Sequence, residues 1–202
     1  MPSRKSLTLL STVEEAFDFA STMFDVNDFP NGGEFLISYL WPHKIPMKVL
    51  RRYDWCINFH PAPPHLRGRG CASRALWNGD TYFGVTVHHM SEELDAGQII
   101  SVTPVAILET DNYQTLMNRA RRTLFDEFEA TLYSLSMGKY LPTSGDFWSG
   151  ELWDTKRFIE WMTMDASSDP ASIDKMIRCC AGSKPGPYLR SGKHTFSYER
   201  AF

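Results

Sequence analysis

The sequence is poor in several features that define common protein classes. Its 202 residues include only four cysteines, and no two of them have the CxxC spacing of a zinc or redox motif. We therefore expect neither structural disulfides nor a metal site. The sequence has no apolar run long enough to cross a bilayer and no signal-peptide pattern at its start. These absences predict a cytoplasmic protein with no membrane partner.

An excess of basic residues is also missing. The chain has 21 Lys and Arg residues against 24 Asp and Glu residues, a formal net charge of −3 and a pI near 6.1. Because binding along a nucleic-acid backbone depends on a basic surface, we expect no nucleic-acid partner. Hydrophobic residues make up 43% of the sequence, which is enough for one ordinary domain with a real core.

The sequence does contain a regular alternation of strand-like and helix-like segments, which favours parallel strands joined by helical crossovers. A capping pattern at Thr12 and Glu15 marks the start of the first helix. A similar pattern at Asp111 and Gln114 opens the longest helix. The predicted strands are 6–11, 34–40, 54–60, 82–90 and 98–107, and the predicted helices are 12–24, a short helix after 46, 71–80, 111–137 and 169–180.

These segments predict two parts of unequal size. Residues 1–139 should form a Rossmann-like α/β domain with a mostly parallel sheet flanked by helices. Residues 140–202 should form a small extension, with a helix and a hairpin over 187–202 that turns at Ser191 and Gly192. An isolated hairpin is only marginally stable, so this one must dock on another surface. We therefore predict a homodimer that covers the apolar hairpin side chains, which are Tyr188, Leu189, Phe196, Tyr198 and Phe202.

The stretch "INFHPAPPHLRGRG" (57–70) joins a predicted strand to a stiff, proline-rich loop. Because residues two apart in a strand share a face, Asn58 and His60 should project together. Pro61 cannot donate to a sheet ladder, so the strand should end there, at the edge where open α/β sheets bind ligands. Asp95, in "SEELDAGQII", follows another predicted strand, and the adjacent strand ends should bring it close to His60.

The three side chains of this group have complementary chemistry. A neutral imidazole accepts a proton, a carboxylate orients that imidazole, and an amide N–H donates to a developing oxyanion. Asn58, His60 and Asp95 therefore fit the attack of an amine on an acyl carbon. Each of them is also a common turn residue. A metal site would have to use ligands without HxH or HExxH spacing, namely His60, His65, one of His88 and His89, and Asp95.

Three segments, "INFHPAPPHLRG", "ALWNGDTYFGVTVHHM" and "ELDAGQII", together resemble the formyltransferase family that uses 10-formyltetrahydrofolate. The resemblance covers about residues 34–137. It implies the formyltransferase fold, 10-formyltetrahydrofolate as formyl donor, and Asn58, His60 and Asp95 as the catalytic residues. It also implies a folate cleft lined by Tyr39, Leu40, Trp41, Ile45, Leu94 and Gly97.

The detail of these motifs most resembles the sugar N-formyltransferases, which act on nucleotide-linked amino sugars. On that resemblance, the acceptor contacts are Arg67, Arg69, His89 and Met90. Because only one strand–helix unit precedes residue 34, we expect a fold shortened at the N-terminus. Because the sequence ends soon after "PGPYL", we expect no room for the second domain of a methionyl-tRNA formyltransferase. Two alternatives stay open, a 10-formyltetrahydrofolate hydrolase and a non-catalytic module that binds folate or a nucleotide sugar.

Overall fold

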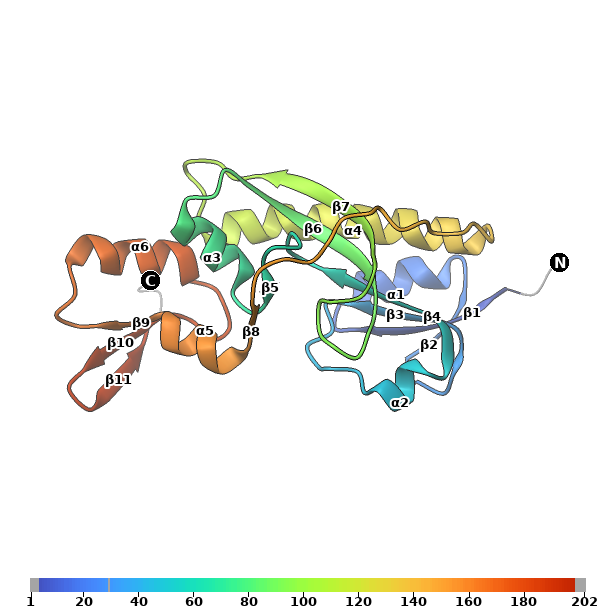
Figure 1. The fold of residues 1–202 in the computed structure, drawn as a ribbon, viewed down its shortest axis with the longest axis horizontal. Coiled ribbons are helices and arrows are strands. Elements are labelled where there is room, and N and C mark those ends of the chain that lie inside the picture. The colour runs from blue at the N-terminus through green and yellow to red at the C-terminus, as the bar shows by residue number, and fades with distance from the viewer. Residues whose placement is uncertain (1–3, 29, 199–202) are drawn as a thin grey trace.

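The computed structural model describes residues 4–28 and 30–198 of the chain. Its centre is a six-stranded sheet, and the strands in spatial order are β2 (Asp25–Asn27), β1 (Ser6–Ser11), β3 (Gly33–Tyr39), β4 (Tyr53–His60), β6 (Tyr82–His89) and β7 (Ile99–Ala106) (Figure 1). The four strands from β2 to β4 are parallel, and β6 and β7 add antiparallel pairs. The predicted α/β fold with a mostly parallel sheet is confirmed.

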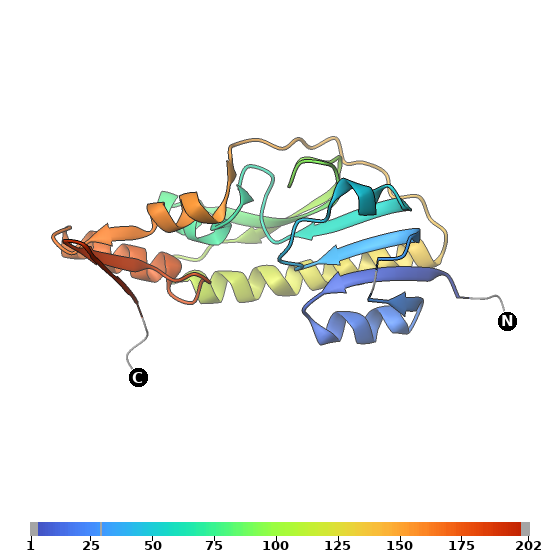
Figure 2. The same cartoon turned by 90° about the horizontal axis from the view of Figure 1, so that it is seen from below.

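Helices cover both faces of this sheet, and they are α1 (Glu14–Ser21), α2 (Met47–Leu50), α3 (Cys71–Asn78) and α4 (Tyr113–Ser136). On one face, α1 and α4 pack on the larger core through rings such as Phe19 and Phe128. On the other face, α2 covers a smaller core around Leu36 and Leu50. The long α4 runs beside the strands for much of the length of the molecule (Figure 2). No described helix has an apolar stretch that could cross a membrane.

Both predicted helix caps are wrong in detail. The N-cap of α1 is Val13, which has no capping side chain, so Thr12 and Glu15 form no capping box. The N-cap of α4 is Asn112, whose side chain forms a capping box with Thr115. The predicted cap, Asp111, is buried instead and accepts hydrogen bonds from the Leu108 amide and from Arg119. The Asp111 carboxylate is taken up by these contacts and by the Thr115 hydroxyl, so it caps no backbone amide of the helix.

The direction of β6 differs from the expectation for parallel neighbours. β6 pairs antiparallel with β4, and the register sets Asn58 opposite His88 and His60 opposite Thr86. The carboxyl ends of β4 and β6 therefore point in opposite directions. Asp95 still reaches the end of β4, because the loop between β6 and β7 folds back over the sheet. The predicted proximity of Asp95 and His60 is right, but the predicted reason is wrong.

Residues after α4 form an extended segment and then a lobe at one end of the molecule (Figure 1). The elements of this part are β8 (Leu152–Trp153), α5 (Thr155–Trp161), β9 (Thr163–Asp165), α6 (Pro170–Cys180), β10 (Tyr188–Ser191) and β11 (His194–Ser197). β8 pairs with β5 (Arg67–Gly68), and β9, β10 and β11 form a three-stranded sheet. The hairpin turns at Gly192 and Lys193, one residue later than predicted. Phe202 lies outside the described residues.

Candidate active site

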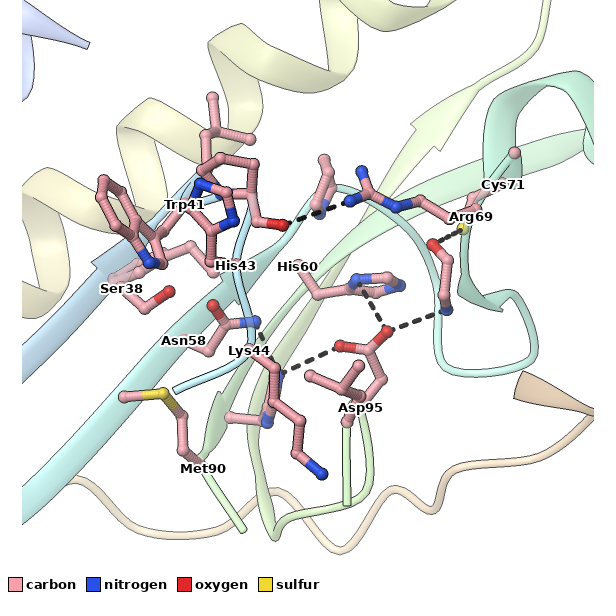
Figure 3. A pocket seen from close by; sticks show the side chains of 18 of the residues that line it. Ser38, Trp41, His43, Lys44, Asn58, His60, Arg69, Cys71, Met90 and Asp95 are labelled. Atoms are coloured by element: carbon pink, nitrogen blue, oxygen red, sulfur yellow. Dashed lines mark hydrogen bonds and ion pairs between the residues drawn. The ribbon is translucent and has the colours of Figure 1, made fainter. Parts of the chain in front are cut away.

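A cavity of about 360 Å³ opens beyond the carboxyl ends of β3 and β4 (Figure 3). Its floor includes Asn58 and His60 at the end of β4. The walls come from segments far apart in the sequence, which include the loop 40–45, the loop 68–72 and the β6–β7 loop. Residues of α4 and of the C-terminal lobe close the far side. The cavity is therefore shared between the sheet and the extension.

Asn58 is held in place by His88, a partner that the sequence analysis did not assign to the site. The Asn58 side-chain nitrogen lies 3.0 Å from His88 Nε2. His88 Nδ1 lies 2.8 Å from the His89 carbonyl oxygen, which can only accept, so Nδ1 carries the hydrogen. Nε2 is then free to accept an N–H from Asn58. Burial lowers the pKa of His88 to about 4, which keeps this imidazole neutral near pH 7.

His60 has a different environment at the same strand end. Its Nε2 lies 2.9 Å from the Leu66 carbonyl oxygen and donates to it, and its Nδ1 lies 3.5 Å from Asp95 Oδ2. Burial by itself would lower the pKa of His60, but the Asp95 carboxylate and the neighbouring Cys71 raise it to about 9. His60 is therefore an imidazolium near neutral pH, paired with Asp95. This charge state disfavours the predicted role of neutral base.

Asp95 is fixed by backbone contacts as well as by its ion pair with His60. It has a left-handed backbone with φ of 47°, and its Oδ2 accepts from the Gly68 amide at 2.8 Å. The side chain of Arg67 donates to the carbonyls of Asp95 (2.7 Å) and Leu94 (3.1 Å). Arg67 thus holds the loop that carries Asp95 and does not line the cavity. The prediction that Arg67 contacts the acceptor is not supported by this position.

Of the other three residues predicted to contact the acceptor, two line the cavity and one does not. Arg69 and Met90 line the cavity, and Arg69 also donates to the Pro42 carbonyl at 3.2 Å. His89 points to the opposite face of β6, where its ring lies 5.6 Å from that of Trp55. Adjacent residues of a strand face opposite ways, so the pairing of His88 with Asn58 excludes His89 from the site.

Four of the six residues predicted for the folate cleft line the cavity, and these are Leu40, Trp41, Ile45 and Leu94. Tyr39 does not. Its ring is buried and packs against Phe59 and Phe128 in the core. Gly97 also lies outside the lining, but it shapes the loop of Asp95. A Cβ atom added at Gly97 would stand 1.7 Å from the His89 carbonyl oxygen, so only glycine allows the two backbone segments to pass this close.

We expect Gly97→Ala to destabilise the fold and to displace the Asp95 loop. The clash with backbone cannot be relieved by a rotamer change, so the free energy of unfolding should fall by about 1–3 kcal/mol. Urea denaturation measures this change. Gly186→Ala is the matched control, because its nearest contact would be an ordinary 3.8 Å. Equal stability of the two variants would contradict the role assigned to Gly97.

Sequence reasoning missed two groups of cavity residues. The alternation of β6 allowed only one of His88 and His89 to face the site, and the prediction selected His89, whereas the structure places His88 there. The second group comes from helices and loops distant in sequence, and comprises Tyr113, Met117, Arg121, Phe158, Ser183 and Lys184. No local motif marks them. Within the described residues, no group of three or more His, Cys, Asp or Glu side chains could hold a metal ion.

Comparison with known proteins agrees with this geometry. Residues 32–129 match the Formyl transferase family, a segment that contains Asn58, His60 and Asp95. This chain carries a formyl transferase domain. A methionyl-tRNA formyltransferase from Streptococcus suis is 36% identical over 89 residues, which are 44% of this chain and 28% of that protein. The chain thus spans under a third of the length of this curated relative.

Solved structures extend the likeness from the formyl transferase domain to almost the full chain. A sugar N-formyltransferase from a Shewanella species superposes with a TM-score of 0.79 at 18% identity, covering 98% of this chain and 97% of that one. PseJ from Anoxybacillus kamchatkensis, solved with a UDP-linked formamido sugar and tetrahydrofolate, has a TM-score of 0.64 at 23% identity over 78% of this chain and 89% of its own. At these identities the likeness shows the fold.

Proposed function

We propose that the protein transfers a formyl group from 10-formyltetrahydrofolate to the amine of a nucleotide-linked amino sugar. The observation that carries this proposal is the convergence of Asn58, His60 and Asp95 at the floor of one cavity in a formyl transferase domain. The Shewanella sugar N-formyltransferase, which matches over almost its whole length, supports the choice of an amino sugar.

The cavity fits the formyl donor. A flat heteroaromatic ring needs apolar walls, and the apolar side chains that line the cavity include Leu40, Trp41, Ile45, Leu50, Met90 and Leu94. The PseJ structure contains tetrahydrofolate, so a related fold accommodates this ring system. When bound, 10-formyltetrahydrofolate supplies an activated formyl carbon on N10. The amide and imidazole at the end of β4 would then face this carbon.

The residues of the chain would act on charge and orientation. The acceptor nitrogen bonds to the formyl carbon, the bond from that carbon to N10 breaks, and the proton of the amine passes to N10. The formyl oxygen gains negative charge during the attack. Asn58 has a second N–H beyond the one directed at His88, and this N–H would donate to the oxygen.

His60 would serve as a cationic donor rather than as the base. Its pKa of about 9 gives an imidazolium near pH 7, which can stabilise a nearby oxyanion. The bond from Nε2–H to the Leu66 carbonyl would have to yield to the substrate, and apo contacts of this kind often rearrange on binding. Asp95 would keep His60 charged by holding the proton on Nδ1.

Three cations support an acceptor that carries phosphates. Arg69, Arg121 and Lys184 reach the cavity from three separate segments. None of the three forms an ion pair with a carboxylate among residues 4–28 and 30–198. Cations without a carboxylate partner in a cavity favour an anionic ligand, and the phosphates of a nucleoside diphosphate are such a ligand.

We expect Arg121→Gln and Lys184→Gln each to raise the KM for the nucleotide sugar about tenfold or more, because each loses a charge-assisted contact. The KM for 10-formyltetrahydrofolate should stay within about twofold. Arg122→Gln is the control, since Arg122 is exposed beside Arg121 and does not line the cavity. A raised KM for the folate alone would instead place these cations at its glutamate carboxylates.

The proposed function is tested by an assay for formyl transfer to candidate acceptors. Purified protein is incubated with 10-formyltetrahydrofolate, a chelator and a panel of nucleotide-linked amino sugars, and mass spectrometry looks for one added formyl group. Methionyl-tRNA forms a separate arm, because the Streptococcus suis relative is a methionyl-tRNA formyltransferase. Formate release without any amine would indicate the hydrolase instead. Folate binding without turnover in every arm would indicate a non-catalytic module.

We also propose that the protein is a homodimer joined through its C-terminal hairpin. β11 is the outer strand of its sheet, all four of its residues are exposed, and Phe196 is 58% exposed. An exposed apolar edge strand is a common pairing surface. Sedimentation should show a dimer at micromolar concentration, and Phe196→Glu should give a monomer. Tyr133→Glu, at an exposed aromatic residue of α4, should leave the dimer intact.

A further inference from the structure

Residues 139–151, here called the strap, connect α4 to β8 without helix or strand structure. The strap runs along the sheet from the end of α4 towards the C-terminal lobe (Figures 1 and 2). Two backbone hydrogen bonds fix it, from the Ser144 amide to the Ile99 carbonyl (2.9 Å) and from the Ser149 amide to the Pro64 carbonyl (3.1 Å). These anchors lie at the start of β7 and in the loop after β4.

One side chain of the strap, Trp148, contacts three parts of the candidate active site. Its ring lies edge-on to His88, with centroids 4.8 Å apart, and edge-on to His60 at 5.6 Å. Its Nε1–H donates to the Gly97 carbonyl oxygen at 2.6 Å. Gly97 lies two residues after Asp95, so this bond ties the strap to the carboxylate loop. The adjacent Phe147, by contrast, is 84% exposed.

We propose that Trp148 is a positioning residue that sets the orientation of His60, His88 and the Asp95 loop and excludes water from them. This inference rests on the proposed function for its catalytic consequence. Trp148 lies outside the segment 32–129 that matches the Formyl transferase family, so the chain completes its site with a residue from beyond that segment.

His88 should report most clearly on the loss of this shield. The groups that face His88 are the Asn58 amide, the Asp95 carboxylate, the ring of His60 and the His89 carbonyl. Burial is the main cause of its lowered pKa, so admitting water should move this pKa back towards its ordinary value. A protonated His88 cannot accept from Asn58, which would then lose its orientation.

For His60 the same change has opposed effects. The groups that face it are Asp95, Cys71 and the Leu66 carbonyl. Burial lowers the pKa of His60 and Asp95 raises it, and water weakens both effects. The shift of His60 therefore carries less information than the shift of His88. A purely structural role for Trp148 would move neither histidine in a folded variant.

The test compares Trp148→Ala, Trp148→Phe and Trp148→Leu with Phe147→Ala as the matched control on the strap. Histidine titrations by NMR, without any substrate, give the pKa of His88, and formyl transfer gives kcat and KM across pH. We expect Trp148→Ala to raise the pKa of His88 and to lower kcat by about 10- to 100-fold with little change in KM. Trp148→Phe keeps a ring but loses the bond to Gly97, so its kcat should be intermediate.

Several outcomes would overturn the proposal. Wild-type kcat and wild-type titration of His88 in folded Trp148→Ala would do so, as would an equal effect of Phe147→Ala. If Trp148→Ala fails to fold by circular dichroism, Trp148→Leu decides, because it keeps a large apolar side chain but no ring or N–H. A wild-type protein that transfers no formyl group would refute the proposed function, while the titrations would still decide the role of Trp148.

Discussion

Asn58→Ala is expected to lower kcat for formyl transfer by roughly 10²- to 10³-fold, because an oxyanion donor acts mainly in the transition state. His60→Asn should lower it by about 10²-fold or more, since the imidazolium is lost. Asp95→Asn keeps the size but removes the charge that raises the pKa of His60, so turnover should fall here too. Single-turnover kinetics with saturating folate and acceptor measure the three effects.

Two substitutions of the same residue types outside the cavity serve as controls for these variants. Asn118→Ala removes an exposed amide on α4, and His65→Asn removes a histidine that does not line the cavity. Both should keep wild-type turnover. Tetrahydrofolate binding should change little in Asn58→Ala, because the apolar side chains that line the cavity are intact. Near wild-type kcat in Asn58→Ala, His60→Asn and Asp95→Asn, with folding verified by circular dichroism, would refute the catalytic assignment.

Activity should decline tenfold per pH unit above about pH 9, where His60 loses its proton and can no longer act as a cationic donor. Below that limit the rate should rise with pH as the acceptor amine becomes neutral, so the profile of kcat/KM should be bell-shaped. A rate that keeps rising through pH 10 would restore the role of neutral base for His60. In Asp95→Asn, the alkaline limb should move to lower pH, because burial alone lowers the pKa of His60.

Stability gives an independent check on the same pKa. The folded-state pKa of His60 is raised from 6.5 to about 9, so protonated His60 stabilises the native state. This contribution is complete below the unfolded pKa and is lost as pH rises from 6.5 to about 9. The unfolding free energy should therefore fall across this range, and His60→Asn should flatten that fall. An unchanged slope in His60→Asn would contradict the assigned pKa.

Local sequence rules determined much of the site. The two-residue period of a strand places Asn58 and His60 on one face, and Pro61 sets the strand end, so both side chains could be predicted at the edge of the sheet. The alternation of strands and helices predicted the α/β fold for a similar reason, since each pattern follows from its own backbone geometry. The motif around Asp95 predicted a third side chain close to His60, and the structure places it there. It did not predict the antiparallel β6 from which the Asp95 loop follows.

Tertiary structure alone decided the rest, because it depends on pairing between distant segments. The antiparallel register of β4 and β6 selects His88 over His89 as the partner of Asn58. The fold of the β6–β7 loop places the carbonyls of Leu94 and Asp95 where they accept hydrogen bonds from Arg67. The charge of His60 results from burial and from Asp95 together, and neither is visible in a strand motif.

The same reason applies to Trp148, Arg121 and Lys184, which reach the cavity region from a strap, a helix and a C-terminal loop. Periodicity and spacing describe contacts between residues near one another in the chain. These side chains meet Asn58 and His60 only after the chain has closed over the sheet. The sequence by itself placed Asn58 and His60 together at the end of β4. The packing of the remaining segments determined the partners of these two side chains and the charged residues that line the cavity around them.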